Sequence, residues 1–213
     1  MFPNLVSYHI HRPCNGDAPD DAEPGPSPAA YQYILAGNGL FVRAATRFWD
    51  ARLLVASFVV RGLPPLTPAF HLKTDRLSSG VLCELVRHAR QRRGEDGRLL
   101  ESLYRVCPLP ERPRIIWPAQ TATPGSVSTE SDRPSGTLLE IHSHGALSAF
   151  WSATDDRDEQ GACIYGVMGR LHTDLPEVRL RLGLYGYWLP LALADLFVLD
   201  NLPFPIRDAQ SAE

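Results

Sequence analysis

Two histidines and an aspartate in the second half of the sequence have the types and spacing of a metal site. One residue separates His142 from His144, and after seven further residues Ser152 and Asp155 follow as S-x-x-D. Side chains two positions apart on a strand point to the same face, so the two imidazoles can converge on one ion. Three protein ligands with an open position for water are typical of a catalytic zinc site. The pattern therefore predicts metal-assisted chemistry at His142, His144 and Asp155.

Each of these residues also has an ordinary structural interpretation. The histidines could be polar residues that alternate along a half-buried strand, and Asp155 could complement the dipole at the start of a helix. Ser152 could cap that helix, a role that is compatible with a catalytic one. For Asp156, Asp158 and Glu159 we expect the dipole role alone.

Composition and charge exclude several classes of function. The chain has 213 residues, of which 44% are apolar and 21% charged, as in ordinary globular proteins. Its net charge is -3 and it has no long basic run, so we expect no nucleic-acid partner. No apolar run could span a bilayer, and the first residues lack the pattern of a signal peptide. We therefore expect a cytoplasmic protein with no membrane partner.

The residues around the motif predict the elements that must position it. A strand over 137–144 should carry the histidines, and a short acidic helix over 152–160 should carry the aspartate. The other predicted elements are a helix over 80–93 capped by Ser79, strands over 99–107, 114–117, 162–171 and 178–188, and a long polar loop over 119–136. This order predicts an α/β (α+β) sandwich for residues 76–213.

Residues 1–75 have the pattern of a separate, β-rich N-terminal region. Asn38-Gly39 lies between apolar runs and predicts a hairpin in which both residues have positive φ. A further strand-like run covers 53–60. Residues 15–30 are rich in proline, glycine and acidic residues, which predicts a mobile loop.

The H-x-H and S-x-x-D stretch resembles the JAMM motif of the MPN-plus (JAB) metalloproteases, a family of deubiquitinating and related isopeptidases. The resemblance implies that His142, His144 and Asp155 bind Zn²⁺ and that Ser152 helps to hold the oxyanion. It also implies an MPN/JAB-like β-sheet flanked by helices, a cytidine-deaminase-like sandwich. The family usually has proline after the second histidine, and this chain has Gly145 instead, which loosens the turn.

Further runs over 149–156, 164–167 and 181–186 are similar to the A proteins of bacterial PRTRC cassettes. The resemblance covers roughly residues 98–200. In those cassettes the A protein accompanies a ubiquitin-like protein and an E1-like (ThiF-like) protein. The resemblance therefore implies a ubiquitin-like substrate, cleaved at a peptide or isopeptide bond, and an E1-like protein as a further partner.

Two glutamates compete for the role of general base. JAMM sites take the base from a strand that follows the first helix of the domain, and Glu101 fits that order. Glu140 shares a strand face with His142 and lies about 7 Å from it along the strand. That position points beside the metal, so it suits a role in supporting the ligands. We assign the base to Glu101 and keep Glu140 as the alternative.

Two other functions are compatible with the sequence. One is a non-catalytic MPN scaffold that binds a ubiquitin-like or E1-like partner, but such relatives usually lose the metal ligands, which this chain retains. The other is a latent enzyme whose loop over 119–136 is ordered by a partner. An extended substrate tail could lie beside the same loop and gain backbone hydrogen bonds. The sequence thus favours a JAMM-type zinc metalloprotease, which is a hydrolase.

Overall fold

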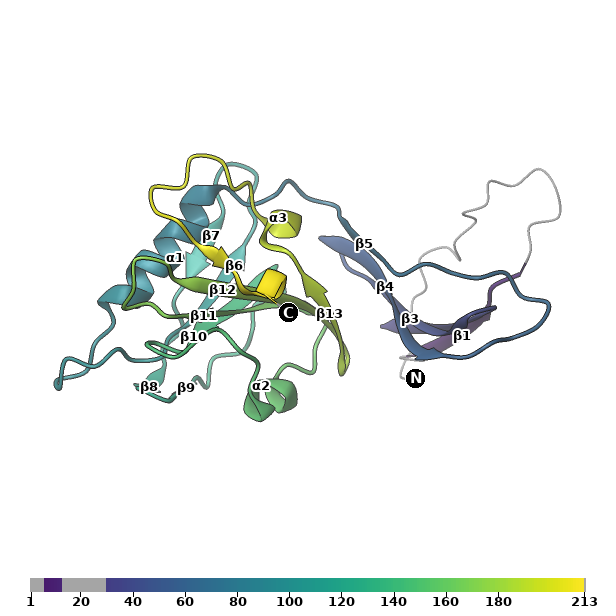
Figure 1. The fold of residues 1–213 in the computed structure, drawn as a ribbon, viewed down its shortest axis with the longest axis horizontal. Helices are drawn as coiled ribbons and strands as arrows, with labels where there is room; N and C mark the ends of the chain where they lie inside the picture. The colour runs from purple at the N-terminus through teal and green to yellow at the C-terminus, as the bar shows by residue number, and fades with distance from the viewer. Residues whose placement is uncertain (1–5, 13–29, 213) are drawn as a thin grey trace. The chain divides into compact units, whose positions relative to one another are not determined.

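The computed structural model describes residues 6–12 and 30–212, and most of its regular structure is β-sheet, with few helices (Figure 1). It is a mixed α+β protein whose contacts divide it into two compact units, Met1–Thr74 and Asp75–Glu213. The mobile loop predicted over 15–30 lies outside the described residues, apart from Ala30. Within the described residues, none of the helices has the length and apolar character to cross a membrane.

The first unit contains a five-stranded sheet in the order β1-β2-β3-β4-β5. β1 pairs with β2 in parallel, and every later neighbour pairs antiparallel. Its strands are β1 (Val6–Ile10), β2 (Tyr31–Ala36), β3 (Gly39–Ala45), β4 (Trp49–Ser57) and β5 (Ala69–Leu72).

The predicted hairpin joins β2 and β3, but its turn differs from the expectation by one residue. Ala36 pairs with Gly39, so the turn residues are Gly37 and Asn38. Gly39 has a φ of 144°, whereas Asn38 does not have positive φ. The Asn38 side chain instead bonds the backbone of Leu66 in both directions at 2.9 Å. A contact distant in sequence therefore decides what this asparagine does.

The second unit is built on a seven-stranded sheet in the order β13-β12-β11-β10-β6-β7, with β14 pairing to β12. β10 and β11 pair in parallel, while β6 and β12 flank them antiparallel. Its main strands are β6 (Leu103–Cys107), β7 (Arg114–Ile116), β10 (Leu139–Ser143), β11 (Cys163–Gly169), β12 (Glu177–Leu184), β13 (Tyr187–Leu191) and β14 (Arg207–Asp208).

One face of this sheet packs on the helix α1 (Ser79–Gln91), which confirms the helix predicted over 80–93. His88 of α1 bonds the hydroxyl of Tyr104 at 3.1 Å, and Tyr104 pairs with Ile141 of β10. Paired residues share a face, so α1 lies on the side of Ile141 and opposite to that of His142. The prediction that Ser79 caps this helix is wrong, because the cap position is Ser78 and its side chain makes no capping bond.

Two predicted elements next to the histidines differ from the structure. The strand predicted over 99–107 begins only at Leu103. The residues before it bond other segments: Leu100 donates to the carbonyl of Arg92, and Glu101 donates to that of Thr123. The predicted loop over 119–136 contains a small hairpin of β8 (Thr121–Thr123) and β9 (Ser126–Ser128).

The strand predicted over 178–188 is two strands, β12 and β13, joined by a turn. Tyr185 and Gly186 form this turn with φ values of 49° and 91°. Glycine adopts positive φ without steric cost, and its presence after an apolar run was the signal for the turn. The short helices are α2 (Ala153–Asp158), within the helix predicted over 152–160, α3 (Leu193–Leu196) and a 3₁₀ turn η1 (Ala209–Ala212).

Candidate metal centre

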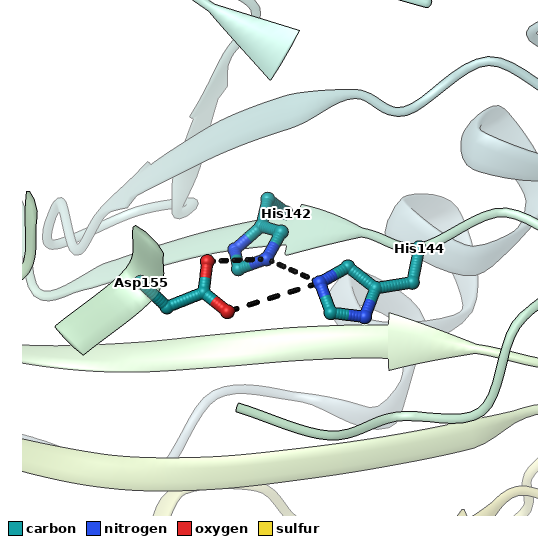
Figure 2. A group of neighbouring side chains, drawn as sticks. All are labelled: His142, His144 and Asp155. Carbon is teal, nitrogen blue, oxygen red and sulfur yellow. Dashed lines mark hydrogen bonds and ion pairs between the residues drawn. The ribbon is translucent and has the colours of Figure 1, made fainter. Parts of the chain in front are cut away.

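The structure brings His142, His144 and Asp155 together, with their side chains pointing toward one another (Figure 2). The Nε2 atoms of the two histidines lie 3.0 Å apart. Oδ1 of Asp155 is 3.2 Å from Nε2 of His142, and its Oδ2 is 3.9 Å from Nε2 of His144. Two imidazole nitrogens and a carboxylate can therefore face one ion, and the group could hold a metal.

Backbone hydrogen bonds to neighbouring strands fix the two histidines. His142 pairs with Val167 of β11 and with Leu103 of β6, so it stands at the centre of the sheet. His144 follows the last residue of β10, yet its N–H still bonds the carbonyl of Met168 at 2.8 Å. The strand direction therefore keeps both imidazoles on the same face, as their spacing predicted.

Gly145 forms the turn directly after the two histidines. Gly145 has a φ of 55°, which lies in the left-handed region. Proline is restricted to a φ near -65°, so it could not occupy this backbone conformation. A Cβ at this position would also lie 3.3 Å from Cβ of Leu99. The chain therefore turns here in a way that excludes proline and favours glycine.

Asp155 is held by a capping box at the start of α2. Its Oδ2 accepts the N–H of Ser152 at 2.7 Å, and its own N–H donates to Oγ of Ser152 at 3.2 Å. Ser152 is thus the helix cap that its position predicted. The cap uses Oγ as an acceptor, so it leaves the hydroxyl hydrogen available for another partner.

Charge and burial act differently on the three side chains. Burial would lower the pKa of His142, but the hydrogen bond to Asp155 and its negative charge raise it above its ordinary value. In His144, burial and the neighbouring His142 lower the pKa to about 4. Burial would raise the pKa of Asp155, but the bonds to His142 and Ser152 hold it well below its usual range. Asp155 therefore stays ionised, and His144 stays neutral, at neutral pH.

Glu101 lies beside this group in a buried position. The N–H of Ser143 donates to the carbonyl of Ser102, next to Glu101, and Glu101 lines the same cavity as His142 and His144. The residue is only 7% exposed. Burial raises the pKa of Glu101 to about 7, while His142 lowers it and Asp155 raises it further. A carboxylate that titrates near neutrality suits proton transfer.

Glu140, the alternative base, is engaged in ion pairs. Its Oε2 accepts a hydrogen bond from Nε of Arg105 at 2.7 Å, and its Oε1 lies 3.8 Å from Arg133. Arg105 also donates to the carbonyls of Ser131 and Asp132. Through Arg105, Glu140 is therefore linked to the segment that follows the β8–β9 hairpin.

These side chains open onto one cavity of about 630 Å³. Its lining includes Glu101, Ser152 and the three residues that could hold a metal. Residues 125–129, which include β9, line the same cavity, and so do the apolar side chains of Leu147 and Phe150. Phe150 packs against His144, with ring centroids 4.6 Å apart. The candidate centre is therefore reachable from a space large enough for an extended peptide segment.

The sequence analysis missed a buried arginine and misassigned two of its partners. Arg181 of β12 binds Asp156 and Glu159, which we had expected only to complement the helix dipole. Asp156 lies in the first turn of α2 as expected, but it also pairs with Arg181. For Asp158 and Glu159 the expectation was wrong, because they are the last residue and the C-cap of α2, and Glu159 pairs with Arg181. The available signal was the alternation of Arg179 and Arg181 with leucines inside an apolar strand, which puts both arginines on one face.

No family model matches this chain, and no curated protein matches it. What can be said of the site therefore comes from its own donor atoms and their surroundings.

Proposed function

We propose that the protein is a zinc-dependent peptidase or isopeptidase of the JAMM type. The observation that carries the proposal is the convergence of His142, His144 and Asp155 on one face of the sheet. They line a cavity together with Glu101, a buried carboxylate whose pKa is near neutrality. A metal, a proton acceptor and a substrate space are what metal-assisted hydrolysis needs in one place.

The spacing of the donor atoms is compatible with zinc. Zinc binds nitrogen and oxygen ligands at about 2.0–2.1 Å in tetrahedral geometry, so neighbouring ligand atoms lie about 3.3 Å apart. The three separations here are 3.0, 3.2 and 3.9 Å, which bracket this value. Two imidazoles and one carboxylate also match the donor set of catalytic zinc sites, which keep the fourth position open.

In this proposal each residue of the chain has a distinct task. Zinc held by the three ligands would supply Lewis acidity, which lowers the pKa of a water molecule and polarises a carbonyl. Glu101 accepts the proton of the attacking water and delivers it to the leaving amine. The hydroxyl of Ser152 lines the cavity and donates to the charge that develops on the carbonyl oxygen, a contribution of about 3 kcal/mol in comparable sites.

The proposed substrate is a ubiquitin-like protein, cleaved near its C-terminal tail or at a conjugated lysine, with an E1-like protein as a further partner. The supporting observation is the β8–β9 hairpin, because β9 lines the cavity and, within the described residues, pairs only with β8. An extended tail could add to that hairpin and gain backbone hydrogen bonds.

Zinc content and cleavage together test the proposal. The purified protein should bind about one zinc per chain by elemental analysis. It should also cleave a ubiquitin-like domain fused through its C-terminal tail to a reporter. A chelator should abolish cleavage, and added zinc should restore it. A wild-type chain that binds no zinc at micromolar concentration would rule the proposal out.

A further inference from the structure

The helix α2 cannot be held in place by its own packing. It has six residues and none of their side chains is buried. A helix of this length is marginal on its own. It nevertheless carries Asp155, and its cap is Ser152. Something outside the helix must therefore fix these two residues toward the histidines.

The side chain of Arg181 contacts this helix at two acidic residues. Its Nε donates to Oε2 of Glu159 at 2.7 Å, and its Nη1 donates to Oδ1 of Asp156 at 2.7 Å. Its Nη2 lies 2.5 Å from the same Glu159 oxygen. The Arg181 side chain is only 5% exposed. One buried guanidinium thus binds two carboxylates in charge-assisted hydrogen bonds.

Arg181 also contacts the residue just before the cap. Its Cζ lies 3.9 Å from the ring centroid of Trp151 and 4.8 Å from that of Trp188. Trp151 directly precedes Ser152, whereas Asp156 and Glu159 follow Asp155. The guanidinium therefore contacts the chain on both sides of the capping box.

Arg181 belongs to the same sheet face as the two histidines. It pairs with Tyr165 of β11, which in turn pairs with Glu140 of β10. Glu140 is two residues before His142, so all of these side chains share one face. A second residue of β12 on this face, Glu177, accepts the N–H of Ala149 in the loop before Trp151. The strand therefore holds the loop and the helix to one rigid surface.

We infer that Arg181 is a positioning residue that fixes the segment 151–159 to β12 and thereby holds Asp155 and Ser152 toward His142 and His144. It does not bind substrate, because its Nε and Nη1 donate to carboxylates of its own chain and the side chain is buried. That Asp155 binds a metal rests on the proposed function. That Arg181 holds α2 in place does not.

The principal test replaces Arg181 with methionine and uses Arg179→Met as the matched control. Arg179 lies on the same strand and face, but it bonds the carbonyl of Ala209. In zinc-free Arg181→Met we expect amide exchange at Asp155 and Glu159 to rise at least about tenfold, because the helix loses its anchor. Zinc affinity should fall at least about tenfold, as for other residues that orient metal ligands. The control should leave both quantities within about twofold.

Arg181→Met leaves Glu159 buried without a partner, and this variant could fail to fold. A second pair of variants, which perturbs the fold less, covers that case. The side chain of Asp156 is 46% exposed, so Asp156→Asn keeps the fold while weakening one contact to Arg181. Asp158→Asn removes the same charge from the same helix. We expect weaker zinc binding and faster α2 exchange in Asp156→Asn only. Arg181→Lys keeps the charge but not the planar guanidinium group. Its zinc affinity and its α2 exchange rate should lie between those of wild type and Arg181→Met.

The two measurements separate failure of this inference from failure of the proposed function. If wild type binds zinc and Arg181→Met or Asp156→Asn binds it equally well with unchanged α2 exchange, the positioning role is wrong and the zinc site stands. If wild type binds no zinc, the proposed function is wrong, and the exchange data alone then decide whether Arg181 anchors α2. Faster exchange confined to 152–159 supports the anchor, and uniform or unchanged exchange overturns it.

Discussion

The candidate centre is held differently on its two sides. On the sheet side, His142 and His144 are positioned by backbone bonds to neighbouring strands, including the 2.8 Å bond from His144 to Met168. On the helix side, Asp155 is positioned by side chains, namely the Ser152 cap and the ion pairs of Arg181.

The two sides should therefore differ in their sensitivity to substitution. A backbone ladder survives the replacement of a side chain by any residue except proline, because its bonds belong to the main chain. A buried ion pair loses its function when one partner is removed, at a cost of about 3–5 kcal/mol, because the other charge is left without compensation. Substitutions outside the ligands should therefore affect the aspartate side more than the histidine side.

The largest expected effect comes from removing a ligand. His142→Ala, His144→Ala and Asp155→Ala should each lose most of the bound zinc, with affinity reduced at least about a hundredfold. Asp155→Ala should in addition loosen α2, because it removes half of the capping box, which is worth about 1 kcal/mol. Elemental analysis and amide exchange measure the two effects. Full zinc in all three variants would contradict the ligand assignment.

The next effect concerns the general base. Glu101→Gln keeps the shape of the side chain but removes its ability to accept a proton, so it should retain zinc and lose cleavage at least about a hundredfold. Glu140→Gln is the comparison, because Glu140 binds Arg105 and lines the same cavity. It should retain more activity than Glu101→Gln. Near-normal turnover in Glu101→Gln, with Glu140→Gln inactive yet zinc-loaded, would falsify this assignment.

Low pH should weaken zinc binding, because His142 becomes protonated. Because the pKa of His142 is raised, its protonated form persists to higher pH than in an ordinary histidine, and that proton must leave before a metal binds. His144 has a pKa of about 4, and the pKa of Asp155 is lowered, so neither takes up a proton near neutrality. Zinc affinity should therefore fall about tenfold per pH unit below the pKa of His142. Chelator competition between about pH 8 and 5 measures this slope. A slope of two protons per zinc would contradict the asymmetry between the histidines.

The smallest expected effect concerns the edge of β9, where we propose that the substrate tail binds. This edge belongs neither to the strand that carries the histidines nor to the helix that carries Asp155. Val127→Pro removes a backbone N–H from β9, so an added strand loses a hydrogen bond of about 1 kcal/mol. KM for a ubiquitin-like fusion should rise several-fold while bound zinc stays unchanged. Val127→Thr keeps the N–H and serves as the control. Equal KM values in the two variants would place the substrate tail elsewhere.

Much of the site could be predicted from the sequence because its parts are local. The H-x-H spacing puts both imidazoles on one strand face, and the S-x-x-D spacing defines a capping box within one helical turn. The helix over 80–93 could also be predicted from the sequence, because apolar residues at helical spacing indicate a helix with one buried face. Such features depend on residues a few positions apart, so the amino-acid sequence alone determines them.

Only the tertiary structure decided how the surrounding charges are used. Glu140 and Glu101 could not be separated by spacing alone; what distinguishes them is that Arg105 and Arg133, which pair with Glu140, come from other segments. In the same way, the sequence predicts only a helix-dipole role for Asp156 and Glu159, whereas β12 brings Arg181 against both. The state of a carboxylate depends on which charges and how much water surround it, and folding sets both through contacts between residues far apart in the chain.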